Sequence, residues 1–381
     1  MDWGDLDRSE RPFFVYCLDM IKGRVSHLRQ RLDTIVSTPY KLYYGLKYNP
    51  HWPLVNQILS CVDGVEVGSY SELLFCLNRG VSPSRISISG PGKTDDALRL
   101  SIERRVGTIQ IDSSCEFSVV NQIARDLPTQ GIGFLRSMKH QRSSLELPLA
   151  PPTVSGMPTT VRANGLFVSL GNERISHDNL SVVLLAADGE VTRNRSQYTD
   201  APIAFVRLHS GVGQGELGPQ QKIETSAVAQ FAFEAGRGIV TPAGFYAARV
   251  LSVRSLSNGL NQIIVNGGLH HLAGPLARVD SAHFGAQACL VRGGNIVETE
   301  TAEYLVAGSL CLGNDFIHPR MTLPNSIRRG DWVIFSNVGA YGMTASTPFF
   351  IGQDLPREFV LCGGAIAEST RTSFRPYHEC F

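Results

Sequence analysis

The first third of the chain repeats one pattern, a short apolar run followed by a helical pattern. Apolar runs rich in β-branched and aromatic residues predict strands at 12–18, in the run that ends at Lys47, and at 64–69, 86–90 and 108–113. Helical patterns follow these runs at 19–31, near 54–59, from 71 onward, and at 95–104 and 115–125. Strands and helices that alternate at such short spacing are typical of parallel βα units, so we expect a βα barrel.

Polar or glycine residues follow the expected strands where each strand ends. These residues are Lys47, Ser69, Gly90 with Lys93, and Asp112 with Ser113. In a βα barrel the carboxyl ends of the strands form one face, which carries the active site. The sequence therefore predicts a site at this face.

Lys47 is the most informative of these residues, because it ends an apolar run that Pro50 closes. Burial disfavours the charged form of a lysine and makes its amine a good nucleophile toward an aldehyde cofactor. The alternative is a strand-end lysine whose amine extends into solvent.

Composition limits the remaining possibilities. A chain of 381 residues with 43% hydrophobic and 18% charged residues predicts a globular protein of two domains. The net charge of +1 gives no electrostatic reason to expect nucleic acid or a membrane surface as a partner. The eight cysteines show no CxxC pair, so we expect no metal site and a reducing compartment. The acidic first residues show no leader pattern and no run reaches the ~18 apolar residues of a membrane helix, so cytoplasm is expected.

Six short elements stand out in order along the chain: 44–49 (Tyr-Gly-Leu-Lys-Tyr-Asn), 64–73, 233–237 (Phe-Glu-Ala-Gly-Arg), 265–268, 308–311 with Asp315, and 339–342. Together they resemble the fold-type III pyridoxal-phosphate-dependent decarboxylases of the diaminopimelate, ornithine and arginine type. Glu66 and Ala235 depart from the Asp and Pro usual in that family. The resemblance covers residues 10–127 and 230–360. It implies an α/β fold, an alanine-racemase-like (β/α)8 TIM barrel, modified in its middle or not, followed by a β-barrel or β-sandwich domain.

The resemblance also implies a role for each matching residue. Lys47 matches the lysine that holds pyridoxal 5′-phosphate as a Schiff base, and Glu234 the acidic partner of the pyridine nitrogen. Gly236, Arg237 and Tyr341 match positions that bind the cofactor phosphate. Cys311 matches the cysteine that reaches the substrate across a dimer interface and can protonate the carbanion.

Three neighbouring positions bear on the substrate and the dimer interface. Leu312 stands where diaminopimelate and ornithine decarboxylases usually place an acidic residue for the distal amine, which argues against both of those substrates. His270-His271 resembles the branch that acts on carrier-attached or conjugated amino acids, although a histidine pair in a loop is as often simply solvated. Asp315 more readily supports the dimer interface than contacts substrate.

The middle of the chain departs from the family between 127 and 230. Residues 131–136 fit a fifth strand with Arg136 at the usual arginine, and 181–185 fit another strand. Residues 208–215, with Gly211 and Gly213, resemble a remnant of the glycine-rich phosphate loop. His209 fits either that loop or a displaced histidine that stacks on the cofactor, and its distance from Glu234 along the sequence favours the loop. A locally modified barrel, a diverged and impaired site and an altered reading frame all remain open.

We therefore expect a cofactor-binding barrel over residues 20–244 and a β-rich domain over 245–381 that a strand from residues 10–19 completes. The expected function is α-decarboxylation of an amino acid or amino-acid conjugate by a homodimer with shared active sites, without metal. A pyridoxal-phosphate-dependent racemase and a non-catalytic decarboxylase-like paralogue are the alternatives. Absorbance of the bound cofactor and release of CO₂ distinguish the three.

Overall fold

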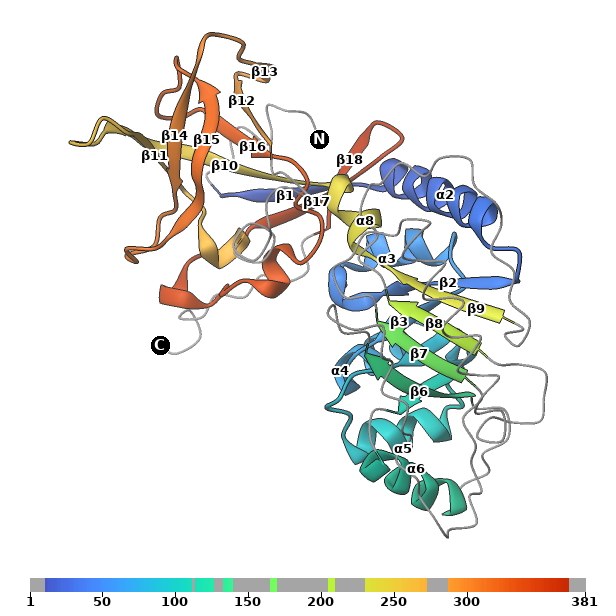
Figure 1. The fold of residues 1–381 in the computed structure, drawn as a ribbon. Coiled ribbons are helices and arrows are strands. Elements are labelled where there is room, and N and C mark those ends of the chain that lie inside the picture. Colours follow the sequence, from blue (N-terminus) through green and yellow to red (C-terminus); the bar gives the residue numbers. More distant parts are fainter. Residues whose placement is uncertain are drawn as a thin grey trace. The chain divides into compact units, whose positions relative to one another are not determined.

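A computed structural model describes residues 11–111, 114–126, 133–139, 165–169, 205–209, 230–272 and 287–369. The chain forms two compact units. The barrel unit comprises residues 24–47 and 58–238, and the sheet unit comprises 1–23, 48–57 and 239–381. Each unit is described below by itself (Figure 1).

Eight parallel strands close the barrel in chain order. Along the chain they are β2 (Tyr40–Gly45), β3 (Gly64–Val67), β4 (Ile86–Ile88), β5 (Thr108–Ile111), β6 (Gly133–Lys139), β7 (Gly165–Ser169), β8 (Phe205–His209) and β9 (Gln230–Ala235). β9 pairs in parallel with β2, which closes the ring. β3 and β4 are buried along their whole length, and β9 is buried after its first residue, as expected of parallel strands covered on both faces.

One helix, α2, precedes the first barrel strand, and the others follow barrel strands. The helices are α2 (Leu18–Ile35), α3 (Trp52–Leu59), α4 (Tyr70–Asn78), α5 (Asp95–Glu103) and α6 (Ser114–Asp126), and the four-residue α8 (Arg237–Val240) follows β9. The Ser69 hydroxyl caps α4 by accepting from the Glu72 N–H, and the Thr94 hydroxyl caps α5 in the same way. Such caps satisfy the first amide groups of each helix where the chain leaves the carboxyl end of a strand.

The sheet unit is built on ten strands. They are β1 (Phe13–Cys17), β10 (Gly244–Ser255), β11 (Asn261–Val265), β12 (Ala288–Arg292), β13 (Asn295–Ile296), β14 (Thr301–Ala307), β15 (Phe316–Pro324), β16 (Trp332–Phe335), β17 (Arg357–Cys362) and β18 (Ala365–Glu368). β1 lies between β10, to which it is antiparallel, and β17, to which it is parallel. A strand from the beginning of the described chain therefore lies inside a sheet made otherwise of the last part (Figure 1).

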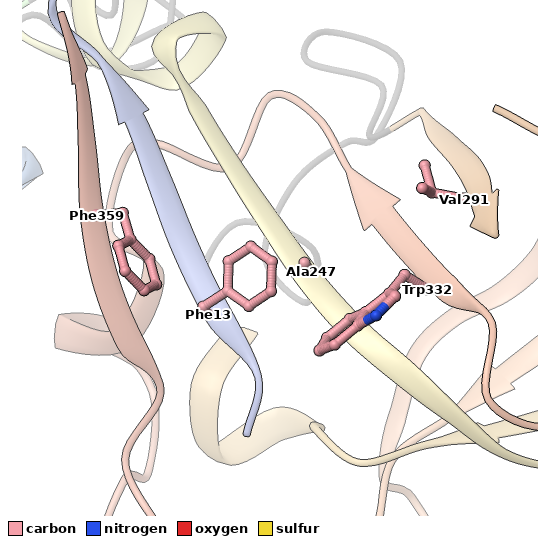
Figure 2. Packing of buried hydrophobic residues seen from close by; sticks show 5 residues of the cluster. All are labelled: Phe13, Ala247, Val291, Trp332 and Phe359. Atoms are coloured by element: carbon pink, nitrogen blue, oxygen red, sulfur yellow. The ribbon is translucent and has the colours of Figure 1, made fainter. Parts of the chain in front are cut away.

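Aromatic side chains form a core on one face of this sheet. The ring of Phe13 lies 5.2 Å from that of Trp332 and 5.7 Å from that of Phe359, and the Phe13–Phe359 contact is edge-to-face. Ala247 and Val291 complete the cluster (Figure 2). Its five residues come from five different strands, so this core joins the strands of the sheet across its width.

The barrel followed by a β-domain confirms the expected fold class, and the predicted early strands and helices agree with the observed ones within a few residues. The strand β7 was not predicted, and residues 181–185 lie outside the described part of the chain. The predicted boundary at 244–245 stays a prediction; the two units divide at 238–239, and residues 48–57 belong to the sheet unit. No helix in the described ranges is long and apolar enough to cross a membrane.

Candidate active site

Lys47 and Glu234 meet at the carboxyl end of the barrel strands. Lys47 lies in a short 3₁₀ helix, Leu46–Tyr48, directly after β2. Its Nζ is 3.2 Å from Oε1 of Glu234, and 46% of the lysine side chain is exposed. Lys47 is less buried than the sequence suggested, because it stands in the turn beyond the strand rather than inside it. The lysine side chain is thus partly exposed while its amine is ion-paired.

Glu234 is fully buried in β9. Its backbone pairs with Tyr43 of β2 on one side and with His209 of β8 on the other. A carboxylate inside a protein is costly unless a cation or hydrogen-bond donors compensate its charge. The Lys47 amine supplies a cation here, so the two residues form a charge pair of one buried and one accessible member.

Two further glutamates lie at this end of the barrel. Glu66 of β3 is buried and accepts a hydrogen bond from the Ser89 hydroxyl. Glu72 accepts from the Gly68 N–H at 2.7 Å. Burial raises the pKa of Glu72, and the Gly68 hydrogen bond and the charge of Lys47 oppose that shift, whereas the charge of Glu66 adds to it. Lys47 therefore interacts with negative charge from β9, through Glu234, and from α4, through Glu72.

A second lysine at the same end of the barrel has no exposed side-chain surface. Lys93, in the turn after β4, places Nζ 3.0 Å from Oε1 of Glu116 on α6. Its ammonium group also donates to the Gly90 carbonyl. The sequence marked Lys93 as a polar strand end, but nothing in it pointed to Glu116. The pair links the turn after β4 to the helix after β5.

The residues predicted for the cofactor phosphate occupy two places. Gly236 is buried between β9 and α8, and Arg237, the first residue of α8, is partly exposed. Tyr341 belongs to the sheet unit, where it adopts a positive φ of 67° and its N–H donates to the Tyr48 carbonyl at 2.6 Å. A Cβ at the nearby Gly339 would lie 1.8 Å from the Val240 carbonyl oxygen, so only glycine fits there.

Cys311 lies in the loop between β14 and β15 and is exposed. The neighbouring Leu312 is 40% exposed, so an apolar side chain accompanies the thiol at the surface. Asp315, which closes the loop, is by contrast buried.

The histidine pair is not solvated, which corrects one of the two alternatives. His270 and His271 are both buried, and their ring centroids lie 3.8 Å apart. His271 hydrogen-bonds through Nδ1 to the Tyr246 hydroxyl at 2.9 Å and through Nε2 to the Asp354 carbonyl at 2.9 Å. Burial lowers the pKa of His270 to about 4, and the charge of Asp315 opposes this shift. The pair is a neutral element of the sheet unit at physiological pH.

The remaining predicted residues are located only in part. Arg136 lies in β6, where its backbone pairs with Ile111 and Leu166. His209 is the last residue of β8, so its backbone is strand rather than loop. The side chains of Arg136 and His209 are not described, and Gly211 and Gly213 lie outside the described residues.

The chemistry of the Lys47–Glu234 pair fits a pyridine-aldehyde cofactor. The amine can attach an aldehyde, and the fully buried carboxylate 3.2 Å from it is suited to hold a ring nitrogen in its protonated form. In the described ranges no three His, Cys, Asp or Glu side chains are grouped closely enough to hold a metal ion.

The family comparison covers most of the chain. A family model described as pyridoxal-dependent decarboxylase, C-terminal sheet domain, matches residues 13–339. The L-glutamyl-[BtrI acyl-carrier protein] decarboxylase of Niallia circulans is 23% identical, over 94% of this chain and 90% of the relative. The 2-[(L-alanin-3-ylcarbamoyl)methyl]-2-hydroxybutanedioate decarboxylase of Staphylococcus aureus is 24% identical, over 93% and 95%.

Solved structures show the same fold. The diaminopimelate decarboxylase of Helicobacter pylori complexed with L-lysine superposes with a TM-score of 0.76 at 16% identity and covers 98% of this chain and 97% of that one. The lysine/ornithine decarboxylase of Vibrio vulnificus complexed with cadaverine gives 0.75 at 17% identity, over 94% and 97%.

Proposed function

Because the chain belongs to the pyridoxal-dependent decarboxylase family, we propose that it removes the α-carboxylate of an amino acid or amino-acid conjugate with pyridoxal 5′-phosphate held at Lys47. The observation that carries this proposal is the contact of 3.2 Å between the Lys47 amine and the buried Glu234 carboxylate.

When bound, pyridoxal 5′-phosphate supplies an electron sink for the charge that CO₂ leaves behind. Lys47 would hold it covalently through Nζ. Glu234 would face its ring nitrogen. A carboxylate that is buried away from solvent favours the protonated form of a neighbouring basic nitrogen. The partly exposed Lys47 would react with the cofactor, and the buried Glu234 would provide a fixed negative charge.

The phosphate group would bind at positions that offer a cation, a hydroxyl and close backbone approach. We assign these roles to Arg237, Tyr341 and the glycines and arginine that match the family, which are Gly236, Gly211, Gly213 and Arg136. His209 is the candidate for the imidazole beside the cofactor ring. Its support is the backbone pairing of His209 with Glu234 across β8 and β9.

Cys311 is proposed to donate the proton at Sγ that replaces the carboxylate on the substrate carbon. Cys311 is exposed in the single chain. A group that reaches the active site of a second subunit must be exposed in this way. We therefore propose a homodimer in which one subunit supplies Lys47 and its partner supplies the thiol. Mixing inactive Lys47→Ala with inactive Cys311→Ala should restore part of the activity, since mixed dimers contain one intact site. No recovery would contradict the shared site.

The surroundings of Cys311 suggest the substrate class. Leu312, exposed beside the thiol, cannot bind a free distal amine. Two relatives are named for substrates whose amino acid is part of a larger molecule, a glutamyl group on a carrier protein and an alaninyl group on a citrate-like acid. We therefore favour an amino-acid conjugate over lysine-like substrates. The seven described cysteines are all unpaired, which supports a cytoplasmic enzyme.

The deciding experiment is the absorbance spectrum of the purified protein with added pyridoxal 5′-phosphate, beside Lys47→Ala. We expect a band at roughly 410–430 nm that borohydride removes, together with a reduced cofactor fixed on the peptide that contains Lys47. Release of CO₂ from conjugated amino acids then identifies the reaction. A folded wild-type protein with neither the band nor the fixed cofactor would refute the proposed function.

A further inference from the structure

The loop that carries Cys311 has an unusual distribution of burial. The four residues 311–314 are all exposed, whereas Leu310 before them and Asp315 after them are buried. Within this stretch the Leu312 carbonyl accepts from the Asp315 N–H at 3.2 Å, and the Asn314 carbonyl accepts from the Phe316 N–H at 2.8 Å, so its described backbone hydrogen bonds run to its C-terminal end. The contacts of Leu310 and Asp315 therefore decide where the backbone of Cys311 lies.

Asp315 connects this loop to a second one through its carboxylate. Oδ2 accepts a hydrogen bond of 2.8 Å from the Leu310 N–H, and Oδ1 accepts one of 2.8 Å from the Leu269 N–H. Leu310 is the residue directly before Cys311. A buried carboxylate that accepts backbone N–H groups forms charge-assisted hydrogen bonds, which are stronger and shorter than neutral ones.

Two glycines make room for the carboxylate. A Cβ at Gly268 would lie 2.6 Å from Oδ1, and a Cβ at Gly308 would lie 2.2 Å from Oδ2. The backbone adds further bonds between the same segments, from the Gly308 N–H to the Asp315 carbonyl and from the Ser309 N–H to the Gly267 carbonyl, both of 2.8 Å. The Gly267-Gly268 and Gly308-Ser309 elements of the sequence are thus two halves of one carboxylate-binding turn.

The turn at Gly267–Leu269, which donates a hydrogen bond to Asp315, also contacts β10. A Cβ at Gly267 would lie 1.8 Å from the Tyr246 hydroxyl oxygen, and that hydroxyl hydrogen-bonds to His271. His271 also bonds to the Asp354 carbonyl. The chain of contacts runs from the sheet core through Tyr246 and His271 to the turn, and from the turn through Asp315 to the residue next to Cys311.

We propose that Asp315 is the positioning residue of Cys311. Its carboxylate fixes the Leu310 N–H and so sets the direction in which the backbone presents the thiol to the substrate. This inference rests on the proposed function, because it gives a purpose to the placement of the proton donor. It concerns the contacts that Asp315 makes within its own chain, and the suggested role of Asp315 at a dimer interface stays a prediction.

The test measures Cys311 directly, without turnover. Purified wild type and Asp315→Asn are alkylated with iodoacetamide under native conditions, and the modification of each cysteine is followed by mass spectrometry. The exposed Cys115 and Cys362 are internal references. We expect the rate at Cys311 to change several-fold relative to both references, and kcat to fall about tenfold or more while KM changes less than about twofold.

If Asp315→Asn does not fold, two alanine substitutions at glycines of the same loop provide the comparison. Gly308→Ala crowds the carboxylate, whereas Gly313→Ala adds a methyl group in the same loop with no atom within 4 Å. Gly308→Ala should reproduce the selective change at Cys311, and Gly313→Ala should not. Equal changes at all three cysteines, or an unchanged Cys311 in a folded Asp315→Asn, would overturn the proposal. If the wild type proves inactive, the alkylation result still decides the positioning role, and the proposed function alone fails.

Discussion

At the scale of single residues, burial separates the two members of the central charge pair. Glu234 has no exposed surface, and Lys47 retains nearly half of its own. Loss of the exposed member removes a cation from beside a fully buried carboxylate, whereas loss of the buried charge leaves an amine on a partly exposed side chain. Stability should therefore respond unequally to the two substitutions.

We predict that Lys47→Ala lowers the free energy of unfolding by about 1–3 kcal/mol, because the buried Glu234 carboxylate loses the ammonium group that lies 3.2 Å from it. Adding Glu234→Gln should recover most of that loss, since the interior charge is then gone. Urea denaturation of the wild type, both single variants and the double variant measures the coupling. A double variant less stable than Lys47→Ala would contradict this account.

His270 gives a prediction about pH. Burial lowers the pKa of His270 to about 4, below the roughly 6.5 of an unfolded histidine. Between these values the unfolded chain binds more protons than the folded one, so the contribution of His270 to stability is complete above about pH 6.5 and is lost as the pH falls toward 4. Replacing it with phenylalanine, which keeps a ring against His271, should reduce the loss of Tm between pH 7 and pH 5.

The control for this experiment is His27→Gln, a substitution at an exposed position. It should leave the pH dependence of Tm as in the wild type. Some dependence should persist in His270→Phe, because burial also lowers the pKa of His271. Parallel curves for the wild type and His270→Phe would show that His270 does not contribute.

Residues of the site that lie in local sequence motifs could be predicted from the sequence. Contacts between segments far apart in the sequence could not. The pattern around Lys47 and the later Glu-Ala-Gly-Arg run pointed to two residues that the structure brings together. Their roles, like that of Cys311, stay predictions. The Lys93–Glu116 pair and the Asp315 contacts were not foreseen, because nothing in the one-dimensional pattern shows which buried groups face each other.

At the scale of elements, the segments that lead into neighbouring barrel strands approach each other closely. A Cβ at Gly107, just before β5, would lie 2.2 Å from the Ser84 carbonyl oxygen. Gly23 lies within α2, where a Cβ meets nothing within 4 Å. The same substitution should therefore have opposite effects at these two glycines.

We predict that Gly107→Ala destabilises the protein by about 1–3 kcal/mol, because the added methyl group forces two backbone segments apart. Gly23→Ala should stabilise it by about 0.5–1 kcal/mol, since alanine loses less backbone entropy in a helix. Thermal denaturation of both variants beside the wild type checks the signs. Loss of stability in Gly23→Ala would contradict the prediction for this helix position.

Element types were predictable where the period of apolar residues was clear. Ser69 and Thr94 mark the starts of α4 and α5, and the strands before them are short β-rich runs. The prediction missed β7, Gly165–Ser169, because a single run of five residues lies there in a sequence without the family's motifs. Its parallel pairing with β6 and β8 is a tertiary property that no local pattern contains.

At the scale of the whole molecule, the sheet unit is assembled from separate parts of the chain. Residues 1–23, 48–57 and 239–381 form it, and the barrel unit comprises what lies between. The two-domain organisation followed from chain length and from the order of the patterns. The inclusion of residues 48–57 did not, since their assignment depends on contacts such as that of the Asn49 amide with the Gly339 carbonyl, at 2.8 Å.

Phe13 tests how strongly β1 holds the sheet together. Its ring is 2% exposed and contacts Trp332 and Phe359 (Figure 2). Phe13→Ala should cost about 3–5 kcal/mol, through lost burial and the cavity left behind. Phe349→Ala, at a position 58% exposed, is the matched control and should change stability little. Similar melting temperatures for the two variants would mean that the sheet unit does not depend on this core.

The position of β1 between β10 and β17 also constrains how the protein is made. On a ribosome, β1 emerges before the barrel unit, and its two neighbours β10 and β17 emerge after it. The aromatic side chains of β1 therefore lack their partners in the sheet while more than two hundred residues are synthesised. Chaperones that bind short apolar segments should engage nascent chains at β1 and release them only when β17 has left the exit tunnel.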